Sequence, residues 1–147
     1  MGFIGVSEDR MRHILGVANQ CYRIAKEKYK LDEVDCRKAY VYGYLHDIGY
    51  AFSSVPAEHP QVGCNLLEGA LDVKVSVVLD HGNPEVPQCL FLKILNEADL
   101  TVDSKGKVVT VLERLEDIRA RHTENSDMYR RPLKLAKKLG LIEPVPC

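Results

Sequence analysis

Residues 36–49 read CRKAYVYGYLHDIG, a run that is apolar on nearly every side after its basic start and that contains a histidine–aspartate pair near its end. A helix that is apolar all round is a buried helix, so the run predicts a central helix that begins near Asp35. We expect Gly49 to end it in the left-handed conformation that glycine adopts readily. His46 and Asp47 then lie in the last turn, beside the core. Since an ionised carboxylate resists burial without a partner, Asp47 requires a cation nearby.

Helical patterns continue on both sides of this run. Residues 7–29 repeat apolar side chains, Leu15 among them, at steps of three and four, and Ser7 can cap the first turn. His13 lies at the edge of this stripe, where it can face a cleft, and Gly16 points away from the stripe. Further elements are predicted as helices at 61–68 (ended by Gly69), 87–100, 111–121 and 132–139 (ended by Gly140), with a turn at 104–107.

Residues 72–81, DVKVSVVLDH, are compatible with two structures. Their valines alternate as in a strand, and β-branched residues favour strands. Against this, Asp72 can cap a helix and Gly82 can end one, and the sequence offers no strong partner strand. We therefore predict a helix here and an all-α fold for the chain.

Composition narrows the classes of function. The 147 residues suit one domain, and the 46% of hydrophobic residues is ordinary for a globular protein. Because 20 basic residues face 21 acidic ones, the chain lacks the basic footprint of a duplex-binding module. We expect no long nucleic acid as partner, whereas a small phosphorylated ligand needs only a local site. The oligomeric state is left open.

The expected compartment follows from the N-terminal residues and the cysteines. Charges at residues 8–10 and 12 interrupt any apolar signal segment, and no run approaches the roughly 18 apolar residues of a membrane span. The five cysteines are odd in number, lack the C-x-x-C spacing and stand mostly among apolar neighbours, which indicates reduced core residues. We therefore expect a cytoplasmic protein without membrane contact.

Histidines and carboxylates form the candidate site. Asp99 is a second aspartate inside an apolar segment, NEADL at 96–100. Any one histidine is more often structural than a ligand, but four of the five occur where helices begin, end or border the core. Two carboxylates and four imidazoles make a mixed nitrogen and oxygen set that suits Fe or Mn, and also Zn, Ni or Co. The candidate histidines are His13, His46, His59 and His81.

The ordered set of motifs RMRH13ILGVA, YLH46D47IG, EH59PQVG, LDH81G and NEAD99L resembles the HD-domain superfamily of metal-dependent phosphohydrolases. The resemblance spans about residues 10–103. It implies a bundle of about six or seven helices around a metal site, in one domain over 1–147 with a metal-binding core at 7–103 and a helical extension at 108–140. It also implies the ligands: His13, His46, Asp47 and Asp99 for one metal, and His59 and His81 for a second, with Asp47 bridging.

Three features separate the chain from particular branches of this superfamily. The HDIGY stretch lacks the glutamate of the H-D-x-x-E pattern in the deoxynucleotidase branch. The HGNPEV stretch lacks the H-H-E and G-Y-P elements of the cyclic-dinucleotide phosphodiesterases. The chain is more similar to the small bacterial HD proteins that split diadenosine tetraphosphate symmetrically, although these carry a His-Thr pair where it has His81-Gly82.

The expected activity is hydrolysis of a nucleotide, dinucleoside polyphosphate or other small phosphoester by a hydroxide that bridges two metals. Asp47, His59 and His81 would be the catalytic residues, with Arg10 and Lys93 as candidate cations for the substrate phosphate. Asp103 either supports the site or is a solvated helix end, and Arg114 either binds substrate or pairs with an acid in its own helix. A non-catalytic regulatory module that binds metal or nucleotide is the alternative, and a nuclease is a third reading.

Overall fold

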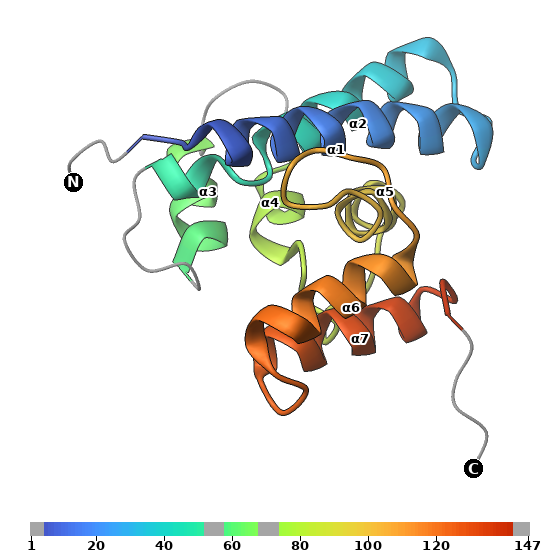
Figure 1. The fold of residues 1–147 in the computed structure, drawn as a ribbon. Coiled ribbons are helices and arrows are strands. Elements are labelled where there is room, and N and C mark those ends of the chain that lie inside the picture. The colour runs from blue at the N-terminus through green and yellow to red at the C-terminus, as the bar shows by residue number, and fades with distance from the viewer. Residues whose placement is uncertain (1–4, 52–57, 68–73, 143–147) are drawn as a thin grey trace.

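The computed structural model describes residues 5–51, 58–67 and 74–142, and this part of the chain is helical throughout, apart from turns and connections (Figure 1). An isolated antiparallel bridge between Val102 and Val108 is the one sheet-like pairing among the described residues. The predicted all-α fold class is therefore confirmed. In chain order the elements are α1 (Glu8–Glu27), α2 (Glu33–Leu45), the 3-10 helix η1 (Ile48–Ala51), α3 (His59–Leu67), α4 (Val75–Asp80), α5 (Leu90–Asp99), α6 (Val111–His122) and α7 (Asp127–Lys138).

Helices α1 and α2 form an antiparallel pair, and α5 packs against both of them (Figure 1). The Ser7 side chain accepts a hydrogen bond from the Arg10 backbone nitrogen, so the predicted cap of α1 is confirmed. Apolar side chains of these three helices and of α4 meet in the larger core, since each helix buries one face. Its buried members include Val17, Cys21, Ala39, Tyr42, Val77, Leu95 and Ala98.

Helix α2 departs from the prediction at its start and in its burial. It begins at Glu33, because the Asp32 side chain accepts from the backbone nitrogen of Asp35 and caps the helix two residues earlier than predicted. Val41 and Tyr44 are 36% and 42% exposed, so the helix is not buried on every side. The apolar sequence predicted burial on every side, but the neighbouring helices cover only one face of α2.

Gly49 has a different role from the one predicted. It does not adopt a left-handed conformation and does not end α2, which stops at Leu45; it lies within η1. A Cβ atom at Gly49 would lie 1.8 Å from the backbone oxygen of His59 and 2.9 Å from the backbone nitrogen of Gly63. The glycine is required because the start of α3 passes directly against η1.

The turn at residues 104–107 is confirmed, and it packs against α1. Gly16 faces this turn instead of solvent: a Cβ on Gly16 would lie 2.7 Å from the backbone oxygen of Gly106. Gly106 itself has φ +87°, a left-handed value that favours glycine. Leu15, which the sequence places in the apolar stripe, is 39% exposed. The paired glycines bring the chain after α5 onto the helix that carries His13.

Helices α6 and α7 pack together below the first core (Figure 1). Helix α6 matches its prediction closely, whereas α7 begins at Asp127 and not at Pro132. The Ser126 side chain caps α7 by accepting from the Met128 nitrogen, and Pro132 lies inside the helix. Gly140 follows α7 with φ +70°, in the predicted terminal position. A second apolar cluster joins the two helices to the core: Leu100, Leu115, Leu135 and Ala136.

Several predictions fall at the edges of the described chain. The helix predicted at 72–81 is confirmed for residues 75–80, and Gly82 follows it with φ +78°. The proposed cap at Asp72, the terminator at Gly69 and the tail at 143–147 lie outside the described residues.

The thiols and the surface add two observations. Cys21 and Cys36 are buried and free, as predicted, whereas Cys89, the N-cap of α5, is exposed. Cys147 lies outside the described residues. Among the described helices, none has the length and apolar character needed to cross a membrane.

Candidate metal centre

The fold brings the six predicted ligands to one place, mainly through the ends of helices. His46 is the C-cap of α2 and Asp47 follows it, while Asp99 is the last residue of α5. His59 is the first residue of α3 and His81 is the C-cap of α4. His13 alone comes from the middle of a helix, on the buried face of α1. Side chains at helix ends can point into a shared space because no next turn fills it.

Asp47 lies at the centre of the cluster, and its two carboxylate oxygens face different partners. Its Oδ2 atom is 3.2 Å from His46 Nε2 and 3.7 Å from His13 Nε2. Its Oδ1 atom is 3.2 Å from His59 Nε2 and 3.5 Å from His81 Nε2. The donor atoms thus fall into two groups that share Asp47: one with His13 and His46, the other with His59 and His81.

Asp99 lies beside the first group. Its Oδ1 atom is 2.9 Å from His13 Nε2 and 3.6 Å from His46 Nε2. The Asp99 side chain is 27% exposed, whereas that of Asp47 is only 4% exposed. One oxygen of Asp99 therefore faces the imidazoles at the wall of the cluster, and Asp47 occupies its interior.

Three of the imidazoles are held by backbone carbonyls. The Nδ1 atoms of His13, His46 and His81 lie 2.8, 2.6 and 2.5 Å from the oxygens of Asp103, Gly43 and Val78. A carbonyl oxygen only accepts a hydrogen bond, so each Nδ1 carries a proton, and Nε2 is the ring nitrogen that faces the cluster. This is the support that proteins commonly give to metal-binding histidines.

Such an arrangement of donors fits a metal ion. The buried Nε2 atom of His46 has no hydrogen-bond partner among the described residues. The Nε2 atoms of His59 and His81 face each other at 3.0 Å. Lone pairs and carboxylate oxygens crowded together repel one another unless a proton or a metal cation lies between them, and the mixed donors suit a transition metal.

The pKa values of the buried carboxylates and of His46 also indicate that the cluster favours positive charge. Burial opposes the charged form of Asp47, but the imidazoles, His46 foremost, hold its pKa well below the ordinary value. The pKa of Asp99 is also held well below its ordinary value, against burial, by His13 and His46. Burial lowers the pKa of His46, and the charges of the two carboxylates outweigh this and raise it to about 10. Both aspartates are therefore ionised, and a bound cation would stabilise their negative charges.

Comparison with protein families agrees with this geometry. The family model described as HD domain matches residues 10–102, well over half of the chain. The chain belongs to the HD-domain family. Comparisons with curated proteins and with solved structures give no match. HD-domain proteins are typically metal-dependent hydrolases, so the family supports phosphohydrolase-type chemistry in general and a divalent metal as cofactor.

The HD-domain cluster opens into a pocket of about 570 Å³. Arg10 lies at its edge, where its guanidinium donates to Asp47 Oδ2 at 3.1 Å and stacks over the Tyr50 ring at 4.0 Å. The Tyr50 ring in turn stacks on His59, with centroids 4.0 Å apart. Burial raises the pKa of Tyr50 to about 12, so its hydroxyl stays protonated. Arg10 is thus close enough to the cluster to contact a ligand there.

Lys93 is not brought to this pocket. It lines a second one of about 470 Å³, together with Lys28 and Lys138. Lys93 lies six positions before Asp99, and at 100° per residue the two side chains lie about 120° apart around α5. The geometric basis for Lys93 as a substrate-binding residue is therefore lost.

Residues beyond the HD-domain match contribute to the pocket in its place. Arg114 of α6 lies 3.4 Å through Nε from the backbone oxygen of Asp99, and its Nη1 is 3.6 Å from Asp117. The pairing within its own helix is therefore present alongside a contact with the cluster. Arg131 of α7 also lines the pocket. The sequence offered no signal for Arg131, because its helix lies about 30 residues after the last motif.

Asp103 supports the site in a way that residue type does not reveal. Helix α5 ends at Asp99, so Asp103 lies in the turn that follows this helix. Its carboxylate accepts from the backbone nitrogens of Lys105 and Lys107, both at 2.9 Å, and fixes the turn. Its backbone oxygen then meets His13 Nδ1. Any residue supplies a carbonyl, which is why the sequence could not identify this contact.

Proposed function

We propose that this HD-domain protein is a divalent-metal-dependent phosphohydrolase that acts on a nucleotide, a dinucleoside polyphosphate or another small phosphoester. One observation carries the proposal: two groups of donor atoms share Asp47, whose two oxygens face opposite ways. A single carboxylate placed between two such groups suits a pair of ions held close together, which is a common arrangement in phosphatases.

The ligands of each ion follow from the groups. His13, His46, Asp47 and Asp99 would hold one ion, and Asp47, His59 and His81 the other. Iron or manganese is the first choice for both, and zinc, nickel and cobalt bind the same types of donor. When bound, the ions would polarise the phosphoryl group and lower the pKa of water to near neutrality.

The chain's own residues have separate tasks in this proposal. Asp47, His59 and His81 are the residues on which turnover depends, because they form the second group and join it to the first. The carbonyls of Gly43 and Val78 fix the rings of His46 and His81, so that these donors need no rearrangement when a ligand arrives. Arg10, now paired with Asp47, is placed to bind a phosphate oxygen once metal neutralises that carboxylate.

The pocket and the charge of the chain favour a small substrate. A volume of about 570 Å³ lies in the range of pockets that enclose small molecules. Proteins that track a polynucleotide use many lysine and arginine contacts, whereas basic and acidic residues nearly cancel here.

The test compares substrates at equal phosphate concentration, with Mn, Fe, Co or Ni added to metal-free protein. We expect hydrolysis of a mononucleotide or dinucleoside polyphosphate that depends on the metal, with little activity on duplex DNA or long RNA. Efficient cleavage of long polynucleotide alone would establish a nuclease and refute the proposal. Tight binding of metal and nucleotide with no turnover under any loading would establish the regulatory module.

A further inference from the structure

The pocket has a second half that lies outside the family match. The HD-domain match ends at residue 102, and α6 and α7 follow it. Even so, seven of the residues around the pocket come from these two helices, Arg114 and Ile118 on α6 and the others on α7. The cluster of donors forms one wall of the pocket, and the α6–α7 pair forms the facing wall.

This facing wall is fixed to the core by contacts along its length. Leu100, which directly follows Asp99, packs in one apolar cluster with Leu115 and Leu135. At the far end of α7, Lys138 Nζ donates to the backbone oxygens of Pro84 and Val86 at 2.7 and 3.0 Å.

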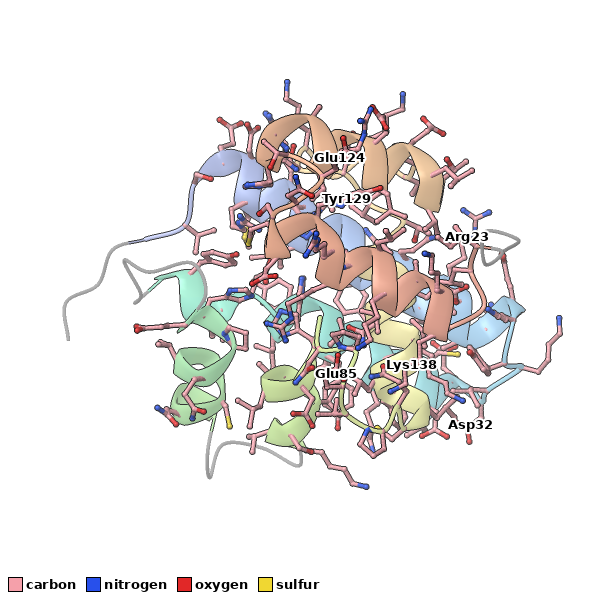
Figure 2. All side chains as sticks on the ribbon, turned by 90° about the horizontal axis from the view of Figure 1, so that it is seen from below. Arg23, Asp32, Glu85, Glu124, Tyr129 and Lys138 are labelled. Carbon is pink, nitrogen blue, oxygen red and sulfur yellow. The ribbon has the colours of Figure 1, made fainter. Side chains whose placement is uncertain are left out.

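The loop after α4 strengthens the same attachment. Lys134 forms an ion pair with Glu85 in that loop. Figure 2 shows Glu85 and Lys138 close to each other where the loop meets α7, with Tyr129 farther along the same helix. The wall is therefore held at both the cluster and the loop, as a binding surface requires.

The α6–α7 wall combines an apolar surface with a few charged side chains. Ile118, Met128, Pro132 and Leu135 supply the apolar surface. Arg114 lies nearest the cluster: its side chain is 12% exposed, and its buried Nη1 has no hydrogen-bond partner among the described residues. That nitrogen has only the 3.6 Å ion pair with Asp117, and an anionic ligand in the pocket would give it a charged hydrogen bond.

We propose that the α6–α7 wall binds the rest of the substrate: its organic group on the apolar surface, and a second anionic group through Arg114 and Arg131. The substrate class is then a phosphoester with a compact organic group and at least two anionic groups, as in a nucleoside diphosphate. Asp127, also on this wall, offers a carboxylate to a hydroxyl or amine of the organic group. The inference rests on the proposed function, which supplies the binding of the first phosphate at the metal ions.

Binding to the metal-loaded protein tests the charged part of the wall. Calorimetric titrations would use inorganic phosphate, adenosine and α,β-methylene adenosine diphosphate. R131Q should weaken binding of the diphosphate analogue about tenfold and leave inorganic phosphate nearly unchanged, since it removes one charged hydrogen bond away from the metals. R130Q is the matched control, because Arg130 is the neighbouring exposed arginine of α7, bonds Asn125 and does not line the pocket.

A second pair of variants tests the apolar part. M128A should weaken adenosine and the diphosphate analogue by about fourfold or more, the effect of one lost methylene contact, and leave phosphate unchanged. L112A is the control, because Leu112 is 66% exposed on α6 and does not line the pocket.

The outcomes separate this inference from the proposed function. Unchanged binding of both adenosine compounds in R131Q and M128A would overturn the inference, even if p-nitrophenyl phosphate were hydrolysed with metal. Weakened binding in these variants supports the inference, even if no phosphoester were hydrolysed, a result that would refute the proposed function alone.

Discussion

The G49A variant probes how tightly the fold sets the position of His59. The new Cβ atom would lie 1.8 Å from the His59 backbone oxygen and 2.7 Å from its carbonyl carbon. Ordinary contact of a Cβ atom begins near 3.4 Å, so η1 and the start of α3 must separate by about 1.6 Å. Both neighbours are backbone atoms, which have no rotamer by which to move aside. Because His59 is the first residue of α3, its imidazole moves with the helix.

Two effects of known size should follow. Overpacking of this kind costs about 1–3 kcal/mol, which lowers the melting temperature of a chain of this length by about 2–12 °C. A shift of about 1 Å in a group that positions reactants can cost about 100-fold in rate. His13 lies on α1, and His46 is the C-cap of α2 and precedes η1, so we expect these two side chains to move less than His59. We therefore expect G49A to fold, to keep one metal ion and to lose the second.

Metal content per chain, thermal unfolding and metal-dependent hydrolysis would be measured on the same preparations. G63A is the matched control: its Cβ would lie 3.3 Å from methyl carbons of Ile48 and Val78, side chains that can yield by a few tenths of an ångström. It makes the same chemical change on the facing helix. If G49A bound two ions and hydrolysed substrate like the wild type, the contact between η1 and α3 would not set the site.

Three further predictions concern the donors themselves. D47A should lower metal occupancy at both positions, measured by elemental analysis, because Asp47 alone faces both groups; loss of a single ion would argue against a bridge. H59A and H81A should reduce turnover heavily and keep one ion, and wild-type rates in either would exclude a dinuclear mechanism. In chelator-treated protein, the raised pKa of His46 (about 10, against an ordinary 6.5) means that its stabilising contribution is present in full below pH 6.5 and falls as pH rises toward 10. Thermal unfolding across that range should show the loss, and H46Q should flatten the curve.

Sequence alone determined the helices and the types of donor. The three- and four-residue spacing of apolar side chains placed α1, α5 and α6 because it follows directly from 3.6 residues per turn. The histidines and aspartates were identified because their chemistry is unusual in apolar segments and because their order matches the HD-domain pattern. Helix starts set by Asp32 and Ser126 were missed, because many polar residues can cap and packing selects the one that does.

Tertiary structure decided which atoms meet. The Asp103 carbonyl that holds His13 belongs to a residue 90 positions away, and a backbone oxygen carries no signature in the sequence. The sequence predicted Gly49 as a helix terminator. A glycine that allows close backbone approach cannot be distinguished by sequence from one that adopts a left-handed turn. By sequence, Lys93 was a candidate cation for the substrate phosphate, whereas Arg131 carried no signal. In the folded chain, Lys93 lies on a side of α5 that does not face the cluster. The packing of α7 on Leu100 brings Arg131 to the pocket. Both positions depend on how the helices pack, which local sequence does not specify.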